Sequence, residues 1–213
     1  FGGLPGLHEL QASPRATTQY LSDLFNSVLL KDVVSRNNIR DTALLNRIIQ
    51  FIFDNVGSTF SAKNISDFLK SQGRKLGVET IYNYLDYLEN AFVIERVKRF
   101  DLKGRKYLET QEKIYAADVG IRNSVLGYRP TDIAGILENL VYLNLRQKGF
   151  TVSVGKSGTS EVDFVASKDG AVLYVQVCYQ LTPENLERGV SPLRQIKDNY
   201  PKLVLTLSDL MLS

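Results

Sequence analysis

The sequence has few of the side chains that build disulfides or soft-metal centres. Its 213 residues include one cysteine, one histidine, one methionine and no tryptophan. A single cysteine excludes an internal disulfide framework, and one histidine with one cysteine cannot form a metal site without carboxylates. We therefore expect a protein of a reducing, cytoplasmic compartment, and we predict no metal site in this chain.

Long apolar runs are also missing. No stretch approaches the roughly 20 apolar residues that a membrane-spanning helix needs, so we expect no membrane partner. The chain begins FGGLPGLHEL, with neither the basic segment of a signal peptide nor an initiator methionine. We expect it to be the C-terminal part of a longer protein.

Neither sign of charge is in large excess. The chain has 26 lysines and arginines against 23 aspartates and glutamates, which gives a net charge of +3. This balance cannot by itself indicate a nucleic-acid partner, so any such argument must come from local clusters of bases. The hydrophobic content of 44% is enough for one large domain or two small ones.

Helix-start signals divide the first half of the chain. Polar caps precede three runs that have apolar residues at helical spacing, and these caps are Ser13 (before Pro14), Asp41 and Ser61. A fourth helix begins after the turn at 73–77, with Val78, Ile81, Leu85 and Leu88 on one stripe. Two strands, 93–100 and 113–117, then form a β-hairpin.

Three helices and a hairpin are the plan of a winged helix, which we predict for residues 41–117. The alternative is a generic helical domain with a hairpin. From residue 132 onward the pattern becomes α-β-β-β-α-β, which predicts a mixed α/β domain over 132–213. Residues 1–40 form a helical segment, and residues 118–131, with two glycines and a proline, are the predicted linker.

Several ordered motifs carry a family resemblance. The stretch "GILENLVYLNLRQKGF…SEVDFVASKDGAVLYVQVCYQL…LRQIKDNYPKLVLTLSD" resembles the C-terminal domain of unknown function found in many prokaryotic AAA-type ATPases. That domain is similar to the PD-(D/E)xK nuclease superfamily. The pieces "FGGLPGL", "LKDVVSRNNIRD" and "KIYAADVGIRN" also look like this ATPase family. The resemblance implies a restriction-endonuclease-like fold for 132–213 and an ATPase domain upstream of Phe1, with 1–40 as the helical remnant that follows it.

ATP and magnesium are therefore implied for the upstream domain, and we predict no cofactor for the present residues. The only string that resembles a phosphate-binding loop is Gly155-Lys156-Ser157. Such a loop needs glycine five residues before Gly155, where Phe150 stands, and a helix after it, where a strand is predicted.

The nuclease site that the resemblance implies lacks two essential groups. Nucleases of this type bind divalent cations through carboxylates, and a nearby lysine helps to activate water. Glu138 and Asp163 match the acidic positions, but Gln176 and Cys178 stand at the acid and the lysine of the (D/E)xK motif. Glutamine supplies no negative charge, and cysteine supplies no positive charge. We predict a vestigial nuclease site with no catalytic residue.

Two alternatives remain for these positions. In the first, the active site has migrated, with Glu161 on the same strand face as Asp163 and Lys156 supplying the amine. In the second, Glu138 and Asp163 are ordinary polar residues at a helix–sheet junction, and Cys178 is a small buried hydrophobe.

The hairpin carries the only strong basic cluster. Within KRFDLKGRK the bases are Lys98, Arg99, Lys103, Arg105 and Lys106. Five phosphate contacts predict a log–log salt slope of roughly −4 to −5. The preceding helix, 77–90, has three acidic residues and no base, which argues against sequence reading in the major groove. We therefore predict DNA binding without sequence specificity.

Three functions follow from these observations. The chain is expected to be a non-catalytic accessory region of an AAA-type ATPase that binds nucleic acid through the basic hairpin. The first alternative is a protein-interaction module that couples the ATPase domain to a protein partner or to another copy of itself. The second is a metal-dependent nuclease with a migrated active site.

Overall fold

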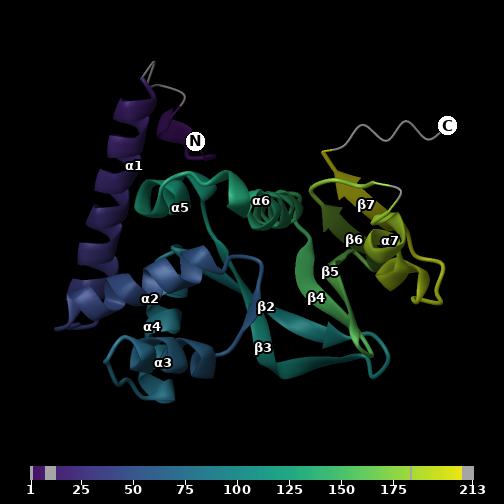
Figure 1. The fold of residues 1–213 in the computed structure, drawn as a ribbon, viewed down its shortest axis with the longest axis horizontal. Coiled ribbons are helices and arrows are strands. Elements are labelled where there is room, and N and C mark those ends of the chain that lie inside the picture. Colours follow the sequence, from purple (N-terminus) through teal and green to yellow (C-terminus); the bar gives the residue numbers. More distant parts are fainter. Residues whose placement is uncertain (1, 8–12, 183, 208–213) are drawn as a thin grey trace. The chain divides into compact units, whose positions relative to one another are not determined.

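The computed structural model of the chain describes residues 2–7, 13–182 and 184–207 (Figure 1). Its contacts define two compact units: a first unit of Phe1–Arg96 with Ile114–Arg129, and a second of Val97–Lys113 with Pro130–Ser213. The fold is mixed α/β, as expected. In the described residues the strands are ordered β1-β3-β2-β4-β5-β6-β7. None of the described helices is both long enough and apolar enough to cross a membrane.

The first unit contains the predicted helices. They are α1 (Pro14–Val28), which continues as a π-helical segment (Leu29–Ser35), α2 (Thr42–Asp54), α3 (Ala62–Ser71), α4 (Val78–Asn90) and α5 (Val119–Leu126). The predicted caps Ser13, Asp41 and Ser61 are confirmed, because each side chain accepts a hydrogen bond from the backbone N–H three residues further on. A short 3-10 turn (Pro5–Leu7) precedes α1, and strand β1 (Thr59–Phe60) precedes α3.

The core of the first unit is built from one stripe of each helix. Leu45, Ile65, Ile81 and Leu85 are completely buried. Val78, which the sequence placed on the same stripe as Ile81, is instead 43% exposed because it is the first residue of α4. Helical spacing therefore predicted the buried face correctly except at its first position.

The hairpin extends through both units. Strand β2 spans Ile94–Asp101 and β3 spans Lys106–Ala116, so the return strand begins earlier than the predicted 113–117. The sequence placed the whole hairpin in the first domain, but the contacts group Val97–Lys113 with the second unit. The segment expected to be a linker, 118–131, contains α5.

The part of the second unit after residue 130 has the predicted element order α-β-β-β-α-β. Its elements are α6 (Ile133–Gln147), β4 (Thr151–Ser157), β5 (Ser160–Lys168), β6 (Ala171–Cys178), α7 (Leu186–Arg194) and β7 (Lys202–Thr206), with a 3-10 turn (Pro130–Asp132) before α6. Pro183 lies outside the described residues. Strands β4, β5 and β6 are antiparallel, whereas β2 pairs with β4, and β6 with β7, in parallel.

Helices α6 and α7 cover opposite faces of this sheet (Figure 1). Phe164 and Val165 are neighbours on β5, so their side chains point to opposite faces. The ring of Phe164 lies 6.1 Å from that of Tyr142 on α6. Val165 instead belongs to a core cluster with Leu193 of α7. We call the two sides the α6 face and the α7 face.

A β-bulge interrupts β5 next to Asp163. Ser153 pairs with Val165 and Gly155 with Val162. Between these two pairs β5 advances three residues and β4 only two, so β5 contains one extra residue. Val162 and Val165 consequently both join the core of the α7 face, despite their odd spacing. Gly155 permits this close approach, because a Cβ there would lie 2.8 Å from Cγ2 of Val165. The Gly155-Lys156-Ser157 string is thus part of a strand.

Candidate functional site

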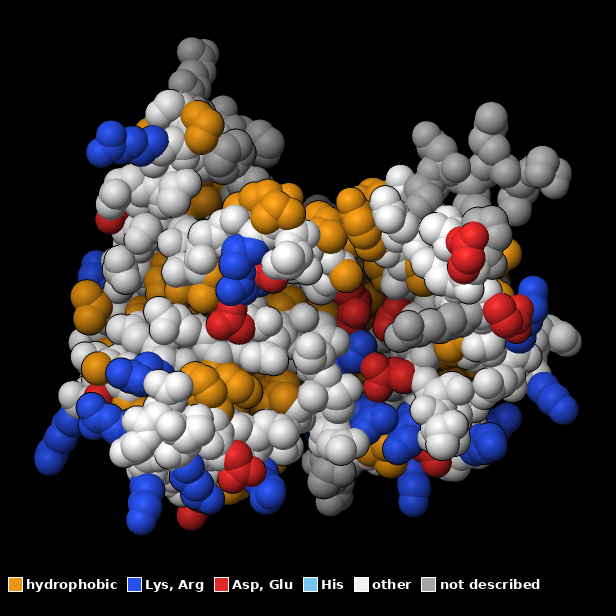
Figure 2. Space-filling model, viewed as in Figure 1, with side chains coloured by type: hydrophobic (Ala, Val, Ile, Leu, Met, Phe, Trp, Pro, Cys, Tyr) orange, Lys and Arg blue, Asp and Glu red, His pale blue; other side chains and the backbone are white. Residues whose placement is uncertain are grey.

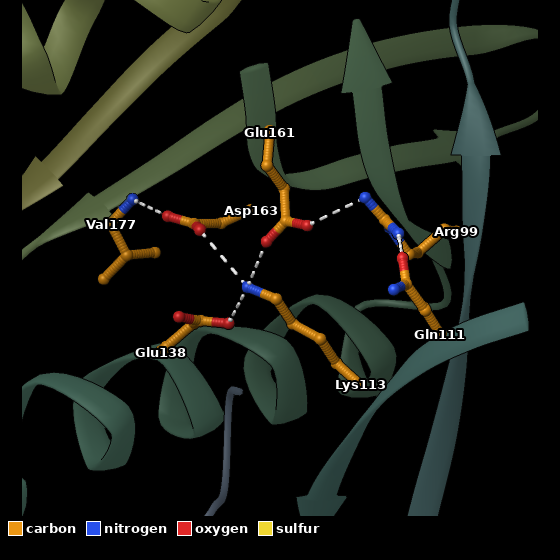
Figure 3. A network of polar contacts seen from close by, with 7 residues as sticks. All are labelled: Arg99, Gln111, Lys113, Glu138, Glu161, Asp163 and Val177. Carbon is orange, nitrogen blue, oxygen red and sulfur yellow. Dashed lines mark hydrogen bonds and ion pairs between the residues drawn. The ribbon is translucent and has the colours of Figure 1, made fainter. Parts of the chain in front are cut away.

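Four elements of the second unit bring five charged side chains together on the α6 face (Figure 3). Arg99 comes from β2, Lys113 from β3, Glu138 from α6, and Glu161 and Asp163 from β5. We call these five residues the carboxylate cluster. The sequence predicted two of its acids, Glu138 and Asp163, as remnants of one site, and the structure places both in contact with the same amine.

Lys113 lies at the centre of the cluster. Its Nζ is 2.9 Å from Glu138 Oε1, 2.9 Å from Glu161 Oε1 and 3.6 Å from Asp163 Oδ1. Its side chain is only 4% exposed. Burial acts to lower the pKa of Lys113, but the three carboxylates outweigh it and raise that pKa above its ordinary value. The amine therefore stays protonated; it donates a hydrogen bond to Glu138 and forms ion pairs with Glu161 and Asp163.

Arg99 is the second cation of the cluster. Its Nη2 lies 3.6 Å from Glu161 Oε2, and its Nη1 donates a hydrogen bond to Gln111 Oε1. The side chain is buried. Arg99, one of the five bases predicted to bind nucleic acid, therefore differs from the other four, because its guanidinium turns inward to Glu161. The other predicted bases, Lys98, Lys103, Arg105 and Lys106, are exposed.

Asp163 is held from two sides. Its Oδ1 faces Lys113, and its Oδ2 accepts a hydrogen bond of 2.8 Å from the Val177 backbone N–H. Burial raises the pKa of Asp163, while Lys113 and the Val177 N–H act against this rise. With three carboxylates and two cations, the cluster carries one excess negative charge when all its members are ionised.

The cluster already contains its own counter-ion. Magnesium and calcium need several oxygens at about 2.0 to 2.6 Å, and here the oxygens converge on an ammonium group. Within the described ranges, no three histidine, cysteine, aspartate or glutamate side chains are grouped so that they could hold one metal ion. The arrangement can therefore pair charges, but its carboxylates are engaged by a protein side chain.

Gln176 and Cys178, the other two residues of the predicted vestigial site, have different surroundings. The Oε1 of Gln176 is buried and accepts no hydrogen bond from the described residues. Cys178 is half-buried, and its Sγ lies 3.2 Å from where a Cβ on Gly189 of α7 would sit. Burial, together with the charge of Asp163, raises the pKa of the Cys178 thiol. Cysteine at this position is thus a small neutral side chain beside α7.

The lysine of the cluster is not the one that the alternative site invoked. Lys156 lies on β4 as the backbone partner of Glu161, but Lys113 makes the ion pairs with Glu161 and Asp163. Lys113 is the first residue of the motif "KIYAADVGIRN", and the sequence predicted no role for it. The available signal was that Lys113 directly precedes the apolar Ile114 and Tyr115, which are buried in the structure. A lysine next to such residues is expected to be paired if it is buried.

Fold and site together define the class of this protein. It is a mixed α/β protein of two compact units, and the second unit carries a buried, internally paired carboxylate cluster. The chain belongs to the family described as "Domain of unknown function (DUF8612)", which matches residues 1–132.

Two similar proteins are known only as uncharacterized. One, from Haemophilus influenzae, is 37% identical over 206 residues, covering 97% of this chain and 50% of its own length. The other, from Methanocaldococcus jannaschii, is 30% identical over 218 residues, covering 98% of this chain and 48% of its own. The chain thus spans about half the length of these relatives. No solved structure matches it significantly.

Proposed function

We propose that this chain is a non-catalytic accessory region of a larger AAA-type ATPase and binds nucleic acid without sequence preference. The position of Lys113 inside the carboxylate cluster carries the non-catalytic part. The sequence resemblance supports the ATPase part, and the double length of the relatives leaves room for such a domain. ATP and magnesium would then act in the preceding part of the protein.

The physical argument concerns competition for the same oxygens. Metal-dependent hydrolysis needs carboxylates that can bind a divalent cation and hold a water on it. In the cluster, Glu138 and Glu161 bind the Lys113 amine at 2.9 Å, and Asp163 faces it at 3.6 Å. A metal would have to displace a buried cation whose pKa is raised by those same carboxylates. This displacement opposes metal binding.

Exposed bases of the hairpin support nucleic-acid binding. Lys98, Lys103, Arg105 and Lys106 remain once Arg99 is assigned to the cluster. Figure 2 shows lysine and arginine side chains gathered at the lower right. In the same view, Figure 1 places the hairpin turn there, where β2 ends and β3 begins. Four phosphate contacts give a log–log salt slope of about −3 to −4, shallower than the five-base expectation. The order of helices and hairpin in 41–117 is that of a winged helix, which we retain as a proposal.

A salt titration tests this function. Binding to duplex and single-stranded DNA should be tight at low salt and weaken with the slope given above. Lys103→Gln with Arg105→Gln and Lys106→Gln should remove most of the binding, whereas Lys148→Gln, an exposed base at the C-cap of α6, should not. Absence of binding at low salt would contradict the proposal.

A metal-dependent nuclease is the second candidate, and one observation favours it. The cluster unites three acids with a lysine, the side-chain types of the nuclease motif, although the lysine comes from β3. The test is incubation of supercoiled DNA with the protein and Mg²⁺ or Mn²⁺. Nicking that disappears in Asp163→Asn would overturn the non-catalytic proposal.

A protein-interaction module is the third candidate. Among the described residues β7 is the last strand of the sheet order, with Leu203 and Leu205 44% and 39% exposed on it and Leu207, just after it, 61% exposed. Exposed leucines on an edge strand are typical of a contact surface. Co-purification with the separately expressed preceding half of the protein tests this idea. The complex should be lost in Leu203→Lys with Leu205→Lys, and an unchanged complex would reject this surface.

A further inference from the structure

A groove of about 840 Å³ opens on the α7 face of the second unit. Its floor includes Val165 and Tyr174 of the central strands, one wall is the hairpin turn with Lys103 and Arg105, and the other is the loop 195–200 after α7. This volume lies within the range of about 300 to 1,000 Å³ that is usual for ligand pockets. We call it the basic groove. It shares no residue with the carboxylate cluster.

Positive charge is in excess along the basic groove. Lys103, Arg105 and Lys197 line it, and none of them forms an ion pair with a described residue. The one acid in the lining, Asp198, accepts a hydrogen bond of 2.7 Å from the Tyr174 hydroxyl and lies 2.9 Å from Lys202 Nζ. Because Asp198 is engaged in this way, the three cations are available to an anionic ligand.

Two half-exposed tyrosines belong to different walls of the groove. Tyr107 is 55% exposed on β3, and Tyr200 is 46% exposed in the loop after α7. The ring of Tyr107 packs edge-on against Phe100, with 5.2 Å between centroids, which fixes its orientation. Each tyrosine therefore leaves ring surface exposed in a groove that is also lined by cations, which is the combination that single-stranded nucleic acids use.

The hairpin wall is fixed in place before any ligand arrives. The backbone N–H of Leu102 donates to the Lys156 carbonyl at 2.9 Å, which ties the turn to β4. Asp101 Oδ1 accepts a hydrogen bond from the Lys103 backbone N–H at 3.1 Å and shapes the turn itself. A wall fixed in this way lowers the ordering cost of binding.

We propose that the basic groove binds a segment of single-stranded nucleic acid. Its phosphates would contact Lys103, Arg105 and Lys197, and its bases would stack on Tyr107 and Tyr200. A duplex cannot use the tyrosines in this way, because its base faces are covered by neighbouring bases. This inference rests on the nucleic-acid binding proposed above and adds the site and the strandedness of the ligand.

Fluorescence anisotropy with the whole chain tests the groove. The probes are a labelled oligothymidylate of about 12 nucleotides and a mixed-sequence duplex of the same length, since single-strand sites cover roughly 4 to 16 nucleotides. We expect tighter binding of the single strand. Tyr107→Ala and Tyr200→Ala should each weaken it about tenfold and leave duplex binding unchanged. Tyr179→Ala, which removes an exposed tyrosine outside the groove, is the matched control.

The outcomes separate this inference from the proposed function. If neither probe binds, both proposals fail. If Lys103→Gln with Arg105→Gln weakens both probes equally while the tyrosine variants bind like wild type, nucleic-acid binding stands and the groove is rejected. Preference for the single strand, lost in the tyrosine variants and kept in Tyr179→Ala, supports the groove. Because the substituted side chains are largely exposed, the thermal midpoints should fall by no more than a few degrees, which checks that each variant is folded.

Discussion

The two faces of the sheet in the second unit differ in whether their basic side chains are paired with acidic ones. On the α6 face, Lys113 and Arg99 are buried and meet carboxylates of the same protein. On the α7 face, Lys103, Arg105 and Lys197 line an open groove without ion pairs to described residues. Breaking a buried ion pair is strongly destabilising, and its charges are already engaged, whereas exposed charges cost little and remain free to bind. Under the proposed function, the cluster has a structural role and the groove is the binding site.

One strand supplies both faces because it is bulged. Glu161 and Asp163 of β5 enter the carboxylate cluster, while Val162 and Val165 enter the core beneath the groove. The extra residue between Val162 and Val165 lets both valine side chains point to the α7 face while Glu161 and Asp163 point to the α6 face. The comparison therefore predicts large stability effects for substitutions in the cluster and small ones in the groove.

Replacing the central lysine should have the largest effect. Lys113→Met leaves the buried Asp163 and the partly buried Glu138 and Glu161 with Arg99 as the remaining cation. We expect a loss of about 3 kcal/mol in unfolding free energy. Urea unfolding measures this loss. Lys148→Met, at an exposed lysine, is the control and should change stability by less than about 0.5 kcal/mol. If Lys113→Met were as stable as Lys148→Met, the charge of Lys113 would not be needed to stabilise the cluster.

The same lysine predicts how stability depends on pH. Its pKa in the folded protein is raised above the value of about 10.4 for an unfolded chain. Its contribution is therefore fully present below about pH 10 and is lost as pH rises through the folded-state pKa. We expect the stability difference between wild type and Lys113→Met to be constant from pH 7 to about pH 10 and to shrink above it. A difference that shrinks already near neutral pH would contradict the raised pKa.

Restoring a lysine in the nuclease motif should fail for a steric reason. The Sγ of Cys178 lies 3.2 Å from the position of a Cβ on Gly189, so Cys178→Lys must displace α7. We expect a cost of about 1 to 3 kcal/mol in unfolding free energy. Cys178→Ala should cost less, and the two variants can be compared by thermal unfolding. A stable Cys178→Lys protein that binds Mn²⁺ would instead support a nuclease ancestry with a site that can be repaired.

Groove substitutions should have the smallest effect on stability. Tyr107→Ala removes a ring that is 55% exposed, and Arg105→Gln removes an exposed charge. We expect changes within about 0.5 kcal/mol for Arg105→Gln and slightly more for Tyr107→Ala, which also loses its contact with Phe100. Thermal unfolding measures both. A cost as large as that of Lys113→Met would remove the contrast between the two faces.

Local signals predicted much of the fold. The caps Ser13, Asp41 and Ser61 and the order of strands and helices after residue 132 are all visible in short windows of sequence. Strand β3 was predicted too short, because its first half is polar and lacks the apolar alternation of a strand. The missed part includes Gln111, which accepts a hydrogen bond from Arg99 of the cluster.

The site was only half predictable because its members are far apart in the chain. Lys113 lies 25 residues from Glu138 and about 50 from Asp163, and no local pattern connects them. Arg99 looked like part of a basic surface because a run of bases does not indicate which side chain turns inward. The bulge in β5 sets the directions of the Glu161 and Val165 side chains, and no sequence pattern predicts it.

Titration of Mn²⁺ into the wild-type protein by calorimetry tests the central claim, that Lys113 takes the place of a metal ion. We predict no binding at millimolar Mn²⁺ in wild type, and binding in Lys113→Met, where the three carboxylates lose their central cation. Stoichiometric binding by wild type that is abolished in Asp163→Asn would contradict the claim and make the cluster a metal centre.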